Sequence, residues 1–399
     1  MSDLRGVSRL AIDATTAVTD LVAAMHHNIG RAPGIFGQPP QGRIQGVTGL
    51  VYRSIRGITG AVGGSIDAIL ARLSLTLEAN ASSEARDAIL AALNGVLGDH
   101  LAATQNPLAV TMRMRIGGKP VTLDPGALQA AIGEPAGKVL LLVHGLCMNG
   151  RQWLRNGHDH GLVLAQKLGY TPIYLEYNTG LHVSTNGAAL SAMMDMLSRA
   201  WPVPVTEVAI LAHSMGGLVA RSACHQAEAA GHPWRDRLRQ LIFLGTPHHG
   251  APLERGGHWL DIAFGMSPYT APFARLGQVR SAGITDLRFG NLLDSDWQDR
   301  DRFERSSDTR QPVPLPRGVD CYVIGATTAR HAESLKSRMV GDGLVPLASA
   351  LGRHDDPARD LGVATHRQWV AVRTNHLDLL SRAKLCTTMR HWLEASMLE

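Results

Sequence analysis

The stretch Val208–Ser222, VAILAHSMGGLVARS, decides the fold because a strand, a tight turn and a helix follow one another in it. The apolar run VAILA leads into Ser214, and the residues from Met215 onward have the pattern of a helix. The five-residue pattern small-x-Ser-x-Gly is common by chance, so its setting carries the prediction. A turn of this kind holds a Ser in strained backbone and projects its hydroxyl out of the sheet. We therefore predict that Ser214 is a nucleophile.

Ala212 stands where the pattern G-x-S-x-G has its first Gly. The turn requires small residues at positions 212 and 216 because the strand and the helix nearly touch there, and an Ala methyl can be accommodated. We expect Ala212 to be a tolerated variation of the pattern.

The chain around this stretch alternates short apolar runs with helical patterns from about Pro107 onward, which is typical of a parallel sheet with crossover helices. The predicted strands are Leu108–Ile116, Val139–Val143, Pro172–Tyr177, Val208–Ala212, Leu241–Leu244, Cys321–Ile324 and Gln368–Val372. The predicted helices are Trp153–Leu168, Thr185–Arg199, Met215–Ala230 and Leu377–Leu393. The fold class is therefore α/β, a mostly parallel sheet flanked by helices.

A Ser hydroxyl needs a base to take its proton and a third group to orient that base. His376 lies in VAVRTNHLDLL, just past the last predicted strand, and Asp342 lies in the Gly-flanked turn MVGDGLVPLAS. The chain order Ser, Asp, His is the one that this architecture requires. His366 and Asp320 are disfavoured because each precedes its strand and belongs at the opposite end of the sheet. We predict that His376 is the base and that Asp342 orients it.

The tetrahedral intermediate of acyl transfer also needs backbone N–H donors. The strand VLLLV runs directly into HGLCMNG, which predicts that the N–H of Leu146 is one donor, joined by the N–H of Met215. Cys147 in the same turn has no orienting His of obvious purpose, so we interpret it as a bystander.

Two groups of His raise the question of a metal site. One is the run His158, Asp159, His160, and the other is His248 with His249 in LGTPHHG. Neither comes with further Cys, His or carboxylates at a recurring ligand spacing, so each is interpreted as structural or pocket-lining. The sequence therefore predicts no metal site at either group.

The segments HG after VLLLV, AHSMGG, GTPHHG, GDGLVP and NHLDLL together resemble the α/β-hydrolase superfamily. Within it, they resemble the bacterial lipase and esterase branch that includes relatives of the inositol deacylase that trims lipid anchors. The resemblance spans roughly Lys138 to the C-terminus, and it implies an α/β-hydrolase fold, hydrolysis of carboxylic esters and no cofactor. The residues that it assigns to the triad and the oxyanion hole are Ser214, Asp342, His376, Leu146 and Met215.

Two further regions lie outside the minimal hydrolase fold. Residues 1–100 are predicted as a helical N-terminal extension, with helices near Leu10–His27, Ile44–Leu75 and Ser83–Leu97, and residues 101–399 as the hydrolase domain. We expect the helices to pack on the rest of the protein or on a second subunit; the alternative is docking on anionic lipid. An insertion at about 250–316 gives no clear strand and is predicted as a cap or lid.

The bulk properties exclude several classes of protein. The 399 residues carry 39 basic and 34 acidic side chains, a net charge of +5, without a basic run, so nucleic acid is not an expected partner. The four Cys are scattered, which favours a reducing compartment, and Asp3, Asp13 and Asp20 interrupt what a signal peptide would need. No apolar run is long enough to span a bilayer. We expect a cytoplasmic protein, with peripheral membrane association as the alternative.

The sequence therefore predicts a serine hydrolase that cleaves carboxylic esters, of lipids or of smaller molecules, through an acyl-enzyme on Ser214. One alternative keeps the same site and transfers the acyl group to an alcohol or amine. The other alternative is a membrane- or partner-binding module with an inert hydrolase domain, which is disfavoured because all three triad residue types are present in order.

Overall fold

The fold is taken from a computed structural model that describes residues 83–251, 281–300, 307–332 and 340–395. The predicted helices near Leu10–His27 and Ile44–Leu75 lie outside the described residues. So do residues 252–280 and 301–306 of the predicted lid. No helix among the described residues is long and apolar enough to cross a membrane.

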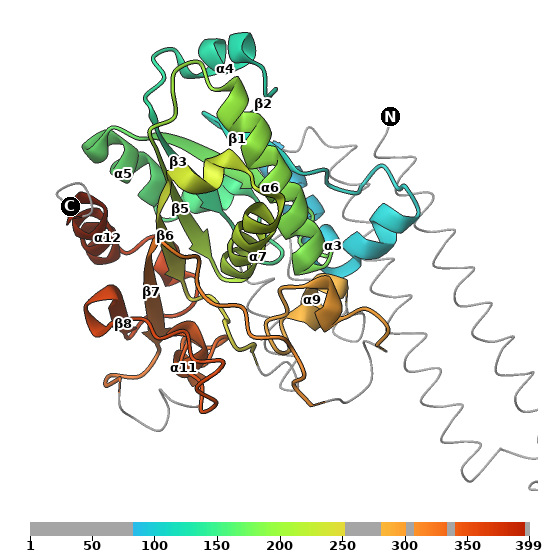
Figure 1. Cartoon of the computed structure of the whole chain (residues 1–399), viewed down its shortest axis with the longest axis vertical. Coiled ribbons are helices and arrows are strands. Elements are labelled where there is room, and N and C mark those ends of the chain that lie inside the picture. Colours follow the sequence, from blue (N-terminus) through green and yellow to red (C-terminus); the bar gives the residue numbers. More distant parts are fainter. Residues whose placement is uncertain (1–82, 252–280, 301–306, 333–339, 396–399) are drawn as a thin grey trace, which may run out of the picture.

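The architecture is a single eight-stranded sheet with helices on both faces (Figure 1). The strands are β1 (Arg113–Ile116), β2 (Lys119–Val121), β3 (Lys138–Val143), β4 (Thr171–Glu176), β5 (Glu207–His213), β6 (Leu238–Leu244), β7 (Asp320–Thr327) and β8 (Gln368–Val372). Their order across the sheet is β2-β1-β4-β3-β5-β6-β7-β8. β1 runs antiparallel to both of its neighbours, and all other pairs are parallel.

The described helices connect and cover these strands. They are α3 (Ser83–Ala103), α4 (Pro125–Ile132), α5 (His160–Leu168), α6 (Val183–Ala200), α7 (Met215–Ala230), α9 (Ala282–Asp286), α11 (Leu347–Ala350) and α12 (Ala383–Ala395). Short 3-10 helices lie at Gly150–Trp153, Pro233–Arg237, Asp294–Asp296, Thr365–Arg367 and Asp378–Leu380.

Alternating residues of the central strands pack into two separate hydrophobic cores, one on each face of the sheet. Leu141 of β3 points to the face covered by α3, α6 and α7, whereas Leu140 and Leu142 point to the face covered by α5 and α12. A strand buried on both faces is apolar at every position, which is why VLLLV and VAILA could be recognised in the sequence as continuous runs.

The predicted alternation of strands and helices is confirmed, with differences at the sheet edge and at the starts of two helices. The predicted strand Leu108–Ile116 forms only its second half, and the chain then reverses through Gly117 and Gly118, at φ 57° and 77°, to add the antiparallel β2. The predicted helix Trp153–Leu168 begins only at His160, because Asp159 caps it by accepting from Leu162 N at 3.0 Å. The predicted helix Leu377–Leu393 begins only at Ala383, as α12, after the 3-10 helix Asp378–Leu380.

Helix α3, the described end of the predicted N-terminal extension, packs directly on the sheet domain. Its residues Ile89, Leu93 and Val96 are fully buried in the same core as α6 and α7. The amide of Asn94 ties the helix to the following segment, donating to Leu108 O at 2.8 Å and accepting from Val110 N at 2.8 Å. The predicted boundary at residue 100 falls inside this helix.

The strand order reverses direction at β3, and this creates the place where a site can form. The chain passes from β3 to β4 on one side and then crosses to β5 on the other side of β3. In open α/β sheets, ligands bind beyond the carboxyl ends of the strands at such a reversal. The turns that follow β3 and β5 meet there, and they carry Leu146 and Ser214 respectively.

Candidate active site

Ser214 occupies the sharp turn between β5 and α7. Its backbone has φ 55° and ψ −129°, a conformation that L residues rarely adopt. The turn is held by hydrogen bonds on both sides: Ser214 N donates to Leu244 O at 2.8 Å, and Gly217 N donates to Ser214 O at 3.0 Å. Because α7 begins at the next residue, the strained turn places Ser214 at the carboxyl edge of the sheet, as the sequence predicts.

Of the two positions around Ser214 that were expected to need small residues, 216 is the more restricted and 212 the less. A Cβ atom at Gly216 would lie 2.5 Å from the carbonyl oxygens of both Val143 and His144, so α7 packs against the backbone at the end of β3. Ala212 is fully buried within β5, between Val143 and Phe243 of the neighbouring strands. Its methyl group is part of the core, which explains why Ala is accommodated at the position where the pattern has Gly.

The structure brings Asp342 and His376 into contact. Nδ1 of His376 lies 2.6 Å from Oδ2 of Asp342, and both side chains are buried. A carboxylate only accepts, so the proton is on Nδ1 and Nε2 carries the lone pair. Nε2 of His376 has no hydrogen-bond partner among the described residues. This is the tautomer that a general base needs.

The backbone around Asp342 is built to hold its carboxylate still. Oδ1 accepts from the N–H groups of Leu344 at 3.0 Å and Val345 at 2.9 Å. The carbonyl of Asp342 accepts from His376 N at 3.1 Å, so backbone and side chain both join the two loops. Gly341 has φ 56°, and a Cβ there would lie 1.9 Å from Val345 O, so the turn requires glycine.

The His376 imidazole lies beside the turn that carries Ser214. A Cβ at Gly245, the residue after β6, would be 3.1 Å from both Nδ1 and Cε1 of His376. The ring of His213 is 4.7 Å from the ring of His376, centroid to centroid. No hydrogen bond joins Ser214 to His376 among the described residues, and such bonds are often long before substrate binds.

The turn after β3 presses against the Ser214 turn from the other side. A Cβ at Gly145 would lie 2.9 Å from Cβ of Ser214. The N–H groups of Leu146 and Met215 donate to no acceptor within the described part of the chain, so both are available to a ligand. The turn is braced by Thr179, whose hydroxyl accepts from Cys147 N at 3.1 Å.

Cys147 is unsuited to nucleophilic chemistry. Burial raises the pKa of its thiol to about 12, and the side chain is almost fully enclosed against α3. A Cβ at Gly95 of α3 would lie 2.2 Å from Cys147 Sγ, which shows how closely the helix covers it. The geometry agrees with the interpretation of Cys147 as a bystander.

Two further His near the turn were not predicted to contribute. His213 donates from Nε2 to the carbonyl oxygen of His376 at 3.2 Å and so links the Ser214 turn to the His376 loop. His144 donates from Nδ1 to Gly145 O at 2.9 Å and stacks on Tyr177. Burial, and for His213 also the charge that His376 can carry, lowers the pKa of each, to about 4 for His144. Both are therefore neutral. Their only signal in the sequence is that they directly precede Gly145 and Ser214.

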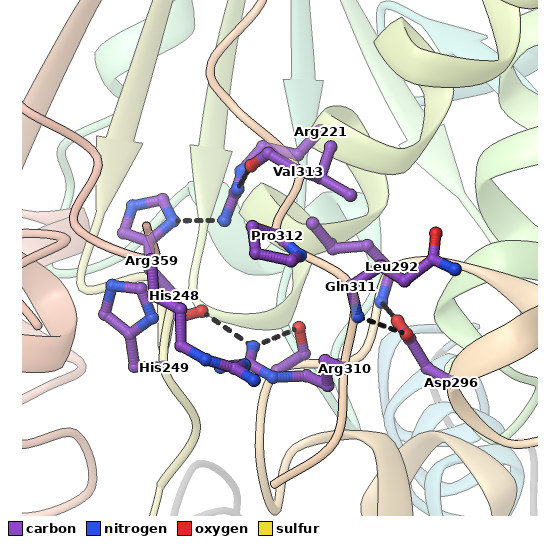
Figure 2. Close-up of a pocket in the computed structure, with 11 residues that line it drawn as sticks. Arg221, His248, His249, Leu292, Asp296, Arg310, Gln311, Pro312, Val313 and Arg359 are labelled. Atoms are coloured by element: carbon purple, nitrogen blue, oxygen red, sulfur yellow. Dashed lines mark hydrogen bonds between the residues drawn. The ribbon is translucent and has the colours of Figure 1, made fainter. Parts of the chain in front are cut away.

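The pair His248 and His249 lines a small pocket with three arginines (Figure 2). Nδ1 of His248 lies 3.3 Å from a guanidinium nitrogen of Arg221, and the carbonyl of His248 accepts from Arg310 at 3.2 Å. Burial is the main cause that lowers the pKa of both imidazoles. Both imidazoles therefore line a pocket, which is one of the two roles expected from the sequence.

One known protein family matches the central part of the chain. Residues 134–310 match the family described as the PGAP1-like alpha/beta domain. The described domain has the α/β-hydrolase fold. The family match ends before Asp342 and His376, so it does not bear on the positions of these two residues.

Solved structures similar to the hydrolase domain include three ester-cleaving enzymes. The mature lipase BlEst2 of Bacillus licheniformis has 18% identity and a TM-score of 0.41, covering 66% of this chain and 93% of that chain. An esterase of Pyrococcus furiosus has 14% identity and a TM-score of 0.38, covering 66% and 83%. The phospholipase PlaB of Legionella pneumophila has 18% identity and a TM-score of 0.33, covering 53% and 44%. No curated protein matches this chain. At these TM-scores, nothing about substrate or mechanism follows from the similarities.

Proposed function

We propose that the hydrolase domain is a serine hydrolase of carboxylic esters. Ser214 Oγ attacks the acyl carbonyl while Nε2 of His376 takes its proton. His376 then returns that proton to the ester oxygen as its bond to the acyl carbon breaks, and the leaving group departs as an alcohol. Water then attacks the acyl-enzyme with His376 again as base, which releases the acid and restores Ser214. Asp342 holds the imidazole and stabilises its cation in both steps.

The observation that carries this proposal is the 2.6 Å contact between Asp342 and His376 beside a Ser in strained backbone. A buried His–Asp contact with the opposite imidazole nitrogen unpartnered is the arrangement that activates a hydroxyl. Further support comes from the neutral state of His213 and His144. Because His144 and His213 are uncharged, neither places a positive charge beside His376 when the His376 ring takes the proton from Ser214.

We assign the oxyanion hole to the N–H groups of Leu146 and Met215. Donors that are free before substrate binds and fixed in a rigid turn stabilise developing charge without reorganisation. Two features of the turns support the assignment: both N–H groups lack a partner within the described residues, and Cys147 N is already bound by Thr179.

The experiment is the Ser214→Ala variant tested with nitrophenyl esters of graded acyl length and with a fluorophosphonate probe. We expect ester turnover and covalent labelling to be abolished while the circular dichroism spectrum is unchanged. Ser198→Ala, on α6, and Cys147→Ala are the matched controls, and both should keep labelling. Labelling that persists in Ser214→Ala, or that is lost in Cys147→Ala, would contradict the assignment of the nucleophile. The acyl-length series also reports which esters the site admits.

A further inference from the structure

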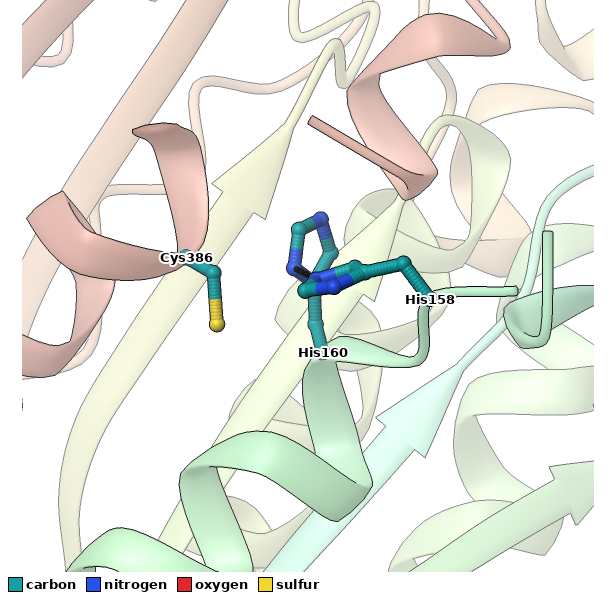
Figure 3. A group of neighbouring side chains, drawn as sticks. All are labelled: His158, His160 and Cys386. Atoms are coloured by element: carbon teal, nitrogen blue, oxygen red, sulfur yellow. Dashed lines mark hydrogen bonds between the residues drawn. The ribbon is translucent and has the colours of Figure 1, made fainter. Parts of the chain in front are cut away.

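Tertiary structure adds a third ligand-type side chain to the pair His158 and His160. Cys386, on α12, lies next to the two imidazoles at the start of α5 (Figure 3). The ligand-type atoms of the three residues all lie within 4.8 Å of one another. His160 and Cys386 are buried and His158 is half-buried, which leaves an approach from solvent on the His158 side.

The backbone holds the two His in fixed positions. Arg155 and His158 exchange two backbone hydrogen bonds of 2.9 Å each around Gly157, which has φ 73°. Asp159, between the two His, caps α5 and accepts from the Tyr174 hydroxyl at 2.9 Å. The imidazoles are thus carried on a braced turn and a capped helix start, and a site that is preorganised in this way loses little entropy on binding.

The hydrogen bonds of His160 are those of a metal-ligating imidazole. Its Nε2 donates to the carbonyl of Leu379 at 2.9 Å, which leaves the lone pair on Nδ1. Ligating His almost always donates its other N–H to a carbonyl or carboxylate in this way. That lone pair now accepts from Nε2 of His158 at 2.8 Å, and the thiol of Cys386 makes no hydrogen bond within the described residues.

We propose that His158, His160 and Cys386 bind a zinc ion through Nε2, Nδ1 and Sγ. A thiolate with two imidazoles is a borderline-soft donor set that suits Zn²⁺, and a water molecule would complete the tetrahedron. Tetrahedral zinc has N and S ligands about 3.3–3.7 Å apart, so binding requires side-chain movements of only about 1 Å.

Binding would release one proton for each zinc ion. The Cys386 thiol gives up its proton to solvent as the Zn–S bond forms. His158 stays neutral: its proton leaves Nε2, and Nδ1 takes up one from solvent, so that Nε2 can bind the metal. His160 keeps its proton on Nε2 and its hydrogen bond to Leu379.

The site would clamp the loop that carries His376. Leu379 follows His376 by three residues, and its side chain and the His376 ring both lie against Gly245. Zinc bound to His160 would fix the imidazole that holds the Leu379 carbonyl, and it would join α5 to α12 through Cys386. The role is therefore structural and does not depend on the proposed ester chemistry.

Cobalt titration of the full chain tests the site directly, because tetrahedral Co²⁺ bound to thiolate has a near-ultraviolet charge-transfer band. We expect about one equivalent to bind with this band, Zn²⁺ to displace it, and Cys386→Ser to abolish it. Cys321→Ser, at another buried free thiol, is the matched control and should keep the band. Absence of the band in the wild-type chain, or its persistence in Cys386→Ser, would overturn the proposal.

A second variant keeps the test decisive if Cys386→Ser fails to fold. His158→Gln removes the most exposed of the three ligands, and we expect it to weaken Zn²⁺ binding by at least roughly 100-fold, since even an outer partner is worth about 10–100-fold. Zinc should raise the melting temperature of the wild-type chain and of Cys321→Ser but not that of His158→Gln. Equal zinc affinity in wild-type and His158→Gln chains would refute the site.

Discussion

Nδ1 of His376 lies 2.6 Å from Oδ2 of Asp342, although the two residues are 34 positions apart in the chain. Both come from loops beyond the carboxyl ends of the last two strands of the sheet, β7 and β8. The other carboxylate oxygen is held by two backbone N–H groups, so the direction in which the imidazole points is determined by backbone geometry.

Asp342→Asn should lower kcat by about 10³–10⁴-fold with little change in KM, because the amide favours the wrong tautomer of His376 while the loop geometry is retained. Steady-state kinetics with an ester substrate measure kcat and KM separately. Asp378→Asn is the matched control, since Asp378 lies two residues from His376 and caps only its own turn. A kcat loss in Asp378→Asn that equals the loss in Asp342→Asn would contradict the assignment.

His213→Phe should lower kcat by about 10–100-fold while KM stays nearly constant. The ring volume is kept, but the donor to the His376 carbonyl at 3.2 Å is lost, so the base can drift from its position. His213 is thus a positioning residue. Fluorophosphonate labelling should be slowed in parallel with kcat. An unchanged kcat with a raised KM would show that His213 shapes the pocket instead.

Gly216→Ala should destabilise the fold by about 1–3 kcal/mol, because its methyl group would lie 2.5 Å from two backbone oxygens that cannot move without shifting β3. Urea denaturation measures the free energy of unfolding. Gly126→Ala in α4 provides the comparison: its nearest neighbour would be Asp124 Oδ1 at 3.5 Å, and Ala is the better helix former there. Equal stability of the two variants would rule out the close approach of α7 to β3.

The free energy of unfolding should fall as the pH drops from about 6.5 to about 4. In the folded chain, burial lowers the pKa of His144 from 6.5 to about 4, so the unfolded chain binds a proton that the folded chain excludes. The contribution of His144 to the free energy of unfolding, roughly 3 kcal/mol, is therefore fully present above pH 6.5 and is lost as the pH falls to about 4. His144→Phe keeps a ring against Tyr177 and should show a correspondingly shallower pH dependence in urea titrations. An identical slope in both proteins would contradict the buried neutral state.

The central sheet could be predicted because its strands are buried on both faces and have to be apolar throughout. The sheet edge formed by β1 and β2 could be predicted less well than the central strands. β1 and β2 are short and partly exposed, so no continuous apolar run marks them, and the turn at Gly117 and Gly118 signals only a local reversal. The start of α5 was predicted too early: the 3-10 helix Gly150–Trp153 and a turn at Gly157 come first, and α5 begins only where Asp159 caps it.

The sequence by itself determined the hydrolase fold and the position of Ser214, because strand burial, helix periodicity and a strained turn depend on residues close together in the chain. Only the tertiary structure decided that His213 holds the His376 loop and that Cys386 joins His158 and His160. Contacts of this second kind form when the sheet brings distant loops and helices side by side, and no local spacing encodes them.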